Sequence, residues 1–148
     1  MNTTALSTMV KIMALLQYLQ LHYRCAHWEC KGYDLHLLFE RLYEVVEEDI
    51  DAFAEKTIGI WGPRVSGEIL RVNDLTNLMG IMSRSTPTLA HLPRSLFLET
   101  MLINQLDRVY AELETSGEMT KGLDDFIMAL MSKHEHNLYL IQQSLGND

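Results

Sequence analysis

The sequence predicts an all-α protein, a bundle of four long helices in which a long connection joins the second helix to the third. Apolar residues recur at intervals of three and four along four separate stretches, which is the period of an amphipathic helix. The 148 residues, of which 47% are hydrophobic, are enough for one sizeable core and too few for two. Residues 1–148 are therefore expected to form a single domain.

The long helices are bounded by residues that stop or start helices. Pro63 ends the second helix, because proline disfavours helix in the residue before it and lacks a backbone donor. Pro93 is favourable in the first turn of the third helix, and Gly146 stops the fourth. The predicted helices are residues 6–27, 34–62, 93–115 and 123–145.

The connection between the second and third helices covers residues 63–91 and is predicted to contain one short amphipathic helix at residues 67–82. A connection of this length allows the second and third helices to run parallel. No apolar run reaches the roughly 18 residues of a membrane-spanning helix. We expect a cytoplasmic protein without a membrane partner.

The second helix carries a strip of polar residues along the edge of its apolar face. These residues are His36, Glu40, Glu47, Asp51 and Glu55. His36 and Asp51 are fifteen residues apart, which is roughly 22 Å along a helix, so one helix cannot bring both to one ion. Iron and zinc hold nitrogen and oxygen ligands at about 2 Å.

The two ends of the strip can meet only if an antiparallel copy of the same helix, from a second subunit, lies alongside. Two metal sites related by a two-fold axis would then form. Each would take His27 and His36 from one chain and Asp51 and Glu55 from the other. Glu40 would be near enough to be a further ligand or to orient one.

At these residues the sequence resembles the Dps-like mini-ferritins, a branch of the ferritin-like superfamily. The resemblance lies in the family's His-Trp pair, its Gly turn, its second His and its Asp-x-x-x-Glu, found here as His27-Trp28, Gly32, His36, and Asp51 with Glu55. The interval of nine residues from His27 to His36 is shorter than is typical of the family. The start of the second helix is therefore expected to differ from that of other members.

The resemblance implies a ferritin-like four-helix bundle whose long crossover contains a short helix. It also implies a ferroxidase that binds ferrous iron between two-fold related subunits and oxidises it with peroxide or dioxygen. The ferric product would be stored as mineral in a hollow homo-oligomer of twelve subunits, a function associated with oxidative stress. The implied catalytic residues are His27, His36, Asp51 and Glu55, and zinc is a possible substitute for iron.

Two other functions compete with this one. A ferritin-like structural or interaction protein would keep the fold without oxidising iron, and the short interval before His36 favours it. Compaction of nucleic acid is disfavoured by the net charge of −8 and by an N-terminal arm in which Lys11 is the only basic residue before Arg24.

The remaining metal-binding residue types are interpreted as structural. No Glu is followed by a His three residues later, so the usual di-iron motif of a single bundle is absent from the sequence. His134, Glu135 and His136 are predicted to be surface or packing residues. Cys25 and Cys30 point to different sides of one helix, which argues against a local disulfide.

Overall fold

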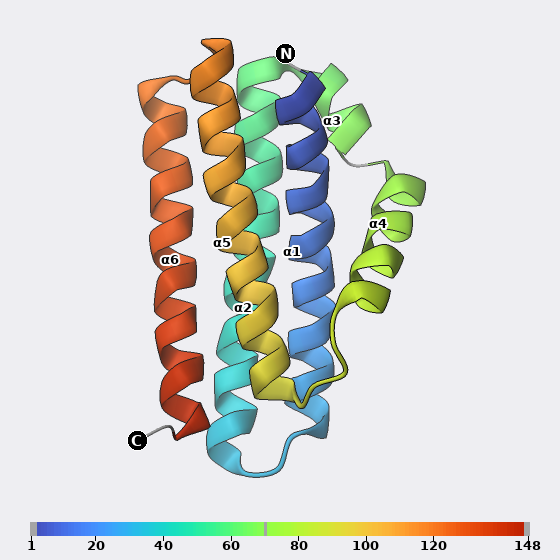
Figure 1. The fold of residues 1–148 in the computed structure, drawn as a ribbon, viewed down its shortest axis with the longest axis vertical. Coiled ribbons are helices and arrows are strands. Elements are labelled where there is room, and N and C mark those ends of the chain that lie inside the picture. Colours follow the sequence, from blue (N-terminus) through green and yellow to red (C-terminus); the bar gives the residue numbers. More distant parts are fainter. Residues whose placement is uncertain (1–2, 70, 147–148) are drawn as a thin grey trace.

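The computed structural model describes residues 3–69 and 71–146, and the regular secondary structure in this part of the chain is entirely helical. Six helices follow one another, and these residues contain no strand. Figure 1 shows four long helices side by side and a shorter pair along one flank. The prediction of an all-α fold is confirmed.

The four long helices form the bundle, and each lies within three residues of its predicted ends. Their bounds are α1 (Thr3–Glu29), α2 (Tyr33–Trp61), α5 (His91–Ser116) and α6 (Lys121–Leu145). In Figure 1, α2 and α5 both rise from the lower end of the bundle, whereas α1 and α6 descend. The second and third long helices therefore run parallel, as the length of the crossover predicted.

The crossover differs from the prediction, because it contains two helices instead of one. They are α3 (Pro63–Ile69) and α4 (Val72–Ser85). The predicted helix at residues 67–82 spans the boundary between them, where Arg71 has an extended backbone and Leu70 lies outside the described residues. Pro63 starts α3 because a first-turn residue needs no backbone donor. Figure 1 shows α4 descending beside α1.

The core is centred on α1. Its residues from Ile12 to Leu16 are all fully buried, although they point in every direction around the helix. This burial follows from the position of α1, which contacts α2, α5, α3 and α4. An amphipathic helix with one apolar face would not suit that position.

The hairpin between α5 and α6 is closed by local signals. Gly117 takes a left-handed conformation after α5, and the Glu118 N–H donates to the carbonyl of Leu113 at 3.0 Å. The Thr120 hydroxyl then caps α6 by accepting from the Leu123 N–H at 3.0 Å. This short connection makes α6 antiparallel to α5.

A buried polar network crosses the middle of the bundle. The ring of His134 in α6 lies between two carboxylates, with Nδ1 2.6 Å from Glu99 of α5 and Nε2 2.6 Å from Asp49 of α2. All three side chains are fully shielded from solvent. Tyr23 of α1 and Asn137 of α6 both donate to the other oxygen of Glu99. The network therefore links all four long helices.

The charge of His134 is set by its two neighbours. Burial alone would lower the pKa of His134, but Glu99 and Asp49 outweigh burial and raise the pKa to about 9. The ring is thus an imidazolium at neutral pH and donates from both nitrogens. Lys133 adds a second cation, because its Nζ lies 2.7 Å from Asp49.

The raised pKa of His134 predicts that stability falls at alkaline pH. An unfolded histidine titrates near 6.5, so the stabilisation of roughly 3 kcal/mol is fully present below about pH 6.5 and is lost as the pH rises through about 9. Urea unfolding at fixed protein concentration, measured from pH 6 to pH 10, checks this slope.

Two variants isolate the contribution of His134. His134→Gln should be less stable by about 3–5 kcal/mol at pH 6, because two buried carboxylates lose their cation, and it should lack the alkaline slope. His136→Gln changes an exposed histidine of the same helix and should behave as the parent. An equal slope in the parent and in His134→Gln would contradict the assignment.

Candidate metal centre

His27 and His36 are brought together by the turn between α1 and α2. The Cys30 N–H donates to the carbonyl of Ala26 at the end of α1, and the His36 N–H donates to the carbonyl of Gly32 at the start of α2. Gly32 has a φ of 96°, a conformation that side chains rarely adopt. A Cβ at Gly32 would also lie 2.9 Å from a carboxylate oxygen of Asp34. Glycine at this position therefore allows the short turn.

The two imidazole rings are stacked, with their centroids 3.8 Å apart and their planes at 24°. Each ring forms a hydrogen bond with the backbone of the other residue. Nδ1 of His27 lies 2.8 Å from the carbonyl oxygen of His36, and Nδ1 of His36 lies 3.0 Å from the carbonyl oxygen of His27. The nine-residue interval therefore places His36 beside His27.

These reciprocal hydrogen bonds define which nitrogen of each ring can bind a metal. A carbonyl oxygen only accepts, so the proton of the neutral ring is on Nδ1 and the lone pair is on Nε2. Metal-binding histidines commonly have this arrangement, in which a backbone carbonyl fixes the tautomer and the direction of the ring. His27 and His36 thus present two oriented nitrogen ligands.

The imidazole pair lies at a partly apolar surface. The edge of the His27 ring meets Tyr43, with centroids 5.4 Å apart. Trp28 and Tyr33 on either side of the turn are 69% and 75% exposed, and Leu37 in the first turns of α2 is 42% exposed. Three exposed large apolar side chains thus lie within a few residues of the two histidines in the sequence.

The carboxylates predicted as ligands lie farther along α2. Asp51 and Glu55 are both exposed, whereas Glu40 is half-buried and lies one turn after His36. Asp51 lines a groove of about 630 Å³ between α1 and α2, together with Glu44, Glu47 and Glu48. Counting only residues that the structure describes, Glu47 is the one acid of this groove with a cation within ion-pair distance, namely Arg24 at 3.8 Å. The groove is strongly acidic.

The structure brings together one half of the predicted ligand set and leaves the other half apart. In the described part of one chain, no three His, Cys, Asp or Glu side chains are arranged so that they could hold a metal ion. The fifteen residues from His36 to Asp51 lie on the uninterrupted helix α2, so their separation is roughly 22 Å. Within one chain, Glu40 does not form such a group with the imidazole pair, and its part in a site shared by two chains stays a prediction.

The buried network of Asp49, Glu99 and His134 contains metal-ligand residue types, but each ring nitrogen already faces a carboxylate oxygen at 2.6 Å. A bound ion would need about 2 Å to each ligand atom, so these contacts leave no room for one. The prediction that His134, Glu135 and His136 are packing or surface residues is confirmed, because His134 is buried in the bundle and Glu135 and His136 are exposed.

Sequence reasoning missed the network as a whole. Its signal was the position of two acids on the apolar faces of their helices. Asp49 lies between the buried residues Val46 and Phe53, and Glu99 follows the buried Leu98. A carboxylate on a buried face requires a cation or several donors, and a histidine on the inner side of α6 was available.

No protein-family model and no curated protein matches this chain. Within residues 3–69 and 71–146, none of the helices combines the length and the apolar character needed to cross a lipid bilayer. Cys25 and Cys30 are both free thiols, as their spacing predicted.

The reciprocal hydrogen bonds predict the tautomers of the pair. At a pH where the rings are neutral, His27 and His36 should both be protonated at Nδ1, because each Nδ1 faces a carbonyl oxygen. Long-range ¹H–¹⁵N correlation spectra of the imidazole rings measure this directly. The exposed His136 is the control and should show the Nε2–H form that predominates in water. Nε2–H rings at both His27 and His36 would contradict the geometry.

Proposed function

We propose that the protein is an iron-oxidising mini-ferritin whose metal centres form between two antiparallel copies of α2. Each centre takes His27 and His36 from one chain and the partner's Asp51 and the partner's Glu55. The midpoint between His36 and Asp51 falls between Tyr43 and Glu44, so the two-fold axis would pass there. Two identical centres would then lie on opposite sides of the axis.

The observation that carries this proposal is the orientation of the imidazole pair. The Nδ1 atoms of both rings are hydrogen-bonded to backbone carbonyls. The Nε2 atoms are therefore left free to bind an ion. A packing or surface role requires no such arrangement of two adjacent rings. The acidic groove on the same helix contains Asp51, and Glu55 follows one turn later on α2.

The surface around the pair supports a second copy as the missing half. Trp28, Tyr33 and Leu37, which flank the two histidines in the sequence, expose large apolar side chains. Burying these side chains against another subunit would remove apolar area from water, at about 25 cal/mol per Å². An antiparallel copy would bring its own acidic groove toward the imidazoles, so each pairing creates two mixed ligand sets.

The ligand set fits ferrous iron as a substrate. Neutral imidazole nitrogens and carboxylate oxygens together suit iron and can also take zinc. The partner's Asp51 and the partner's Glu55 would neutralise the positive charge that grows when ferrous iron becomes ferric. They are four residues apart on one rigid helix, so their carboxylates lie on adjoining turns about 6 Å apart.

The reaction transfers electrons from iron to an oxidant in solution. With peroxide, two ferrous ions each lose one electron, the O–O bond breaks, and two protons are taken up to give two waters. With dioxygen, four ferrous ions and four protons give two waters. The acidic groove, formed by Glu44, Glu47, Glu48 and Asp51, would raise the local concentration of ferrous ions near the centre.

The fold is compatible with the larger assembly that the resemblance implies. A ferritin-like connectivity has parallel second and third long helices joined by a crossover with helical segments, and α2, α3, α4 and α5 follow this order. A shell of twelve subunits built from two-fold dimers would hold the ferric product. The net charge of −8 gives no general surface for nucleic acid.

Co-expression of two inactive variants tests whether the centre is shared between subunits. One variant carries His27→Ala with His36→Ala, and the other carries Asp51→Asn with Glu55→Gln. Each alone should lose rapid oxidation of ferrous iron. When they are co-expressed equally, half of the pairs are mixed and each mixed pair has one intact centre of two, so about a quarter of the parent activity should return.

A matched control removes the same residue types elsewhere. Glu135→Gln with His136→Ala changes two exposed residues of α6 and should oxidise iron at the parent rate. Mixed pairs that form but recover no activity would show that the centre is not shared. A parent protein that oxidises iron no faster than buffer would instead favour the structural or interaction protein.

A further inference from the structure

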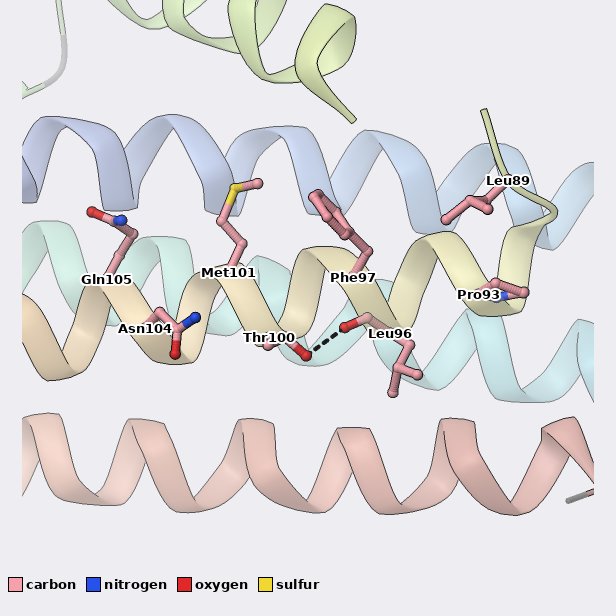
Figure 2. Close-up of a pocket in the computed structure, with 8 residues that line it drawn as sticks. All are labelled: Leu89, Pro93, Leu96, Phe97, Thr100, Met101, Asn104 and Gln105. Carbon is pink, nitrogen blue, oxygen red and sulfur yellow. Dashed lines mark hydrogen bonds between the residues drawn. The ribbon is translucent and has the colours of Figure 1, made fainter. Parts of the chain in front are cut away.

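The described surface has two hollows beside the start of α5, and they differ in chemistry. The larger, about 540 Å³, runs along α5 and has no ionisable side chain in its lining. Figure 2 shows Gln105, Met101 and Phe97 of this hollow projecting from α5 toward α1. The smaller, about 270 Å³, lies between α1 and the start of α5. Its lining is Tyr18, Leu21, His22, Cys25, Leu89, His91 and Arg94.

Arg94 is the main charge of the smaller hollow. Its guanidinium donates to the Tyr18 hydroxyl and lies over the Tyr18 ring, 5.8 Å from the centroid. Among the described residues, no carboxylate lies within ion-pair distance of Arg94, and its Nε has no hydrogen-bond partner. Arg41 and Arg84 also have no ion pair among the described residues, but of these three arginines only Arg94 has a buried Nε without a partner and lines this hollow.

The start of α5 adds partial positive charge to the same place. Ala90 precedes the helix, and no side chain caps its first turn. The first backbone N–H groups of a helix have no partner within the helix, and the helix dipole makes this end positive. In α5 these groups are the N–H of His91 and of Leu92, because Pro93 has no N–H and the Arg94 N–H donates to the Ala90 carbonyl. His91 and Arg94 of the hollow both belong to this first turn. The backbone and the side chains therefore favour an anion together.

Two histidine side chains lie beside Arg94 in the lining. The rings of His22 and His91 are 6.2 Å apart, and Nε2 of His22 is bonded to the Ser95 hydroxyl at 2.8 Å. Burial, followed by the charges of Arg94 and His91, lowers the pKa of His22 to about 4. Burial and the neighbouring charges thus make protonation of His22 unfavourable. An anion in the hollow would offset the repulsion between these positive groups.

One carboxylate of the chain already approaches this position. The Glu29 carboxylate lies 3.2 Å from Nε2 of His91, but its side chain is 63% exposed. An exposed ion pair of this kind contributes little to stability, so a free anion can displace it. Glu29 therefore acts as a weak competitor at the rim of the hollow.

We propose that the hollow between α1 and the start of α5 binds a small oxyanion, held by Arg94, His91 and the first turn of α5. Guanidinium groups and helix N-termini are both suited to tetrahedral oxyanions. One water occupies about 30 Å³ in the liquid, so a volume of about 270 Å³ has room for an ion of phosphate size and several waters. This site is separate from the imidazole pair and does not depend on iron.

Titration of the full-length protein with inorganic phosphate tests the site. Calorimetry in a phosphate-free buffer, with chloride used to keep the ionic strength constant, should show binding with a Kd in the millimolar range or tighter. Arg94→Gln should weaken binding by about tenfold or more, because a charge-assisted contact is lost. Glu29→Gln should tighten binding by about two- to fivefold, because it removes the competing carboxylate.

Arg71→Gln is the matched control, since it removes an exposed arginine of α4 that pairs with Asp74. It should change the Kd by less than about twofold, as expected for a distant surface charge. Circular dichroism establishes that each variant is folded. If Arg94→Gln does not fold, Glu29→Gln decides. Absence of phosphate binding by the parent, parent-like binding by folded Arg94→Gln, or no tightening in Glu29→Gln would each overturn the proposal.

Discussion

The contact of His134 with two buried carboxylates is the constraint on which the bundle depends. Asp49 and Glu99 come from different helices, and each would be costly to bury without the imidazolium between them. The two hydrogen bonds are satisfied only when α2, α5 and α6 have one relative height and rotation. With Asp49 directed inward, Asp51 two residues later is directed to the opposite side of α2. The core network thereby orients the carboxylates on the surface.

Most of the fold was predictable because its signals are local. Apolar periodicity and the residues Pro63, Pro93 and Gly146 located the four long helices to within three residues. The crossover was less predictable, because the short helices α3 and α4 are decided by contacts with α1 and α2. Periodicity across residues 67–82 could not show the break at Arg71, since an apolar pattern can continue through a bend.

The candidate centre was predictable as a set of residues but not as a geometry. Spacing along α2 was enough to show that His36 and Asp51 cannot serve one ion within one chain. The hydrogen bonds between His27 and His36 depend on the path of the turn at Gly32, which a count of residues does not specify. The buried network joins residues from four helices, so no local pattern contains it.

The continuity of α2 also limits how the chain can change in length. Its 29 residues form one helix, which carries His36 from one half of the candidate ligand set and Asp51 and Glu55 from the other. Inserting one residue between His36 and Asp51 would rotate one half by about 100° relative to the other. In a two-fold pair of chains, the same rotation would misalign the ligands of both centres. Insertions and deletions tolerated during evolution should therefore collect in the loop of residues 86–90 between α4 and α5, where loop length has little thermodynamic cost.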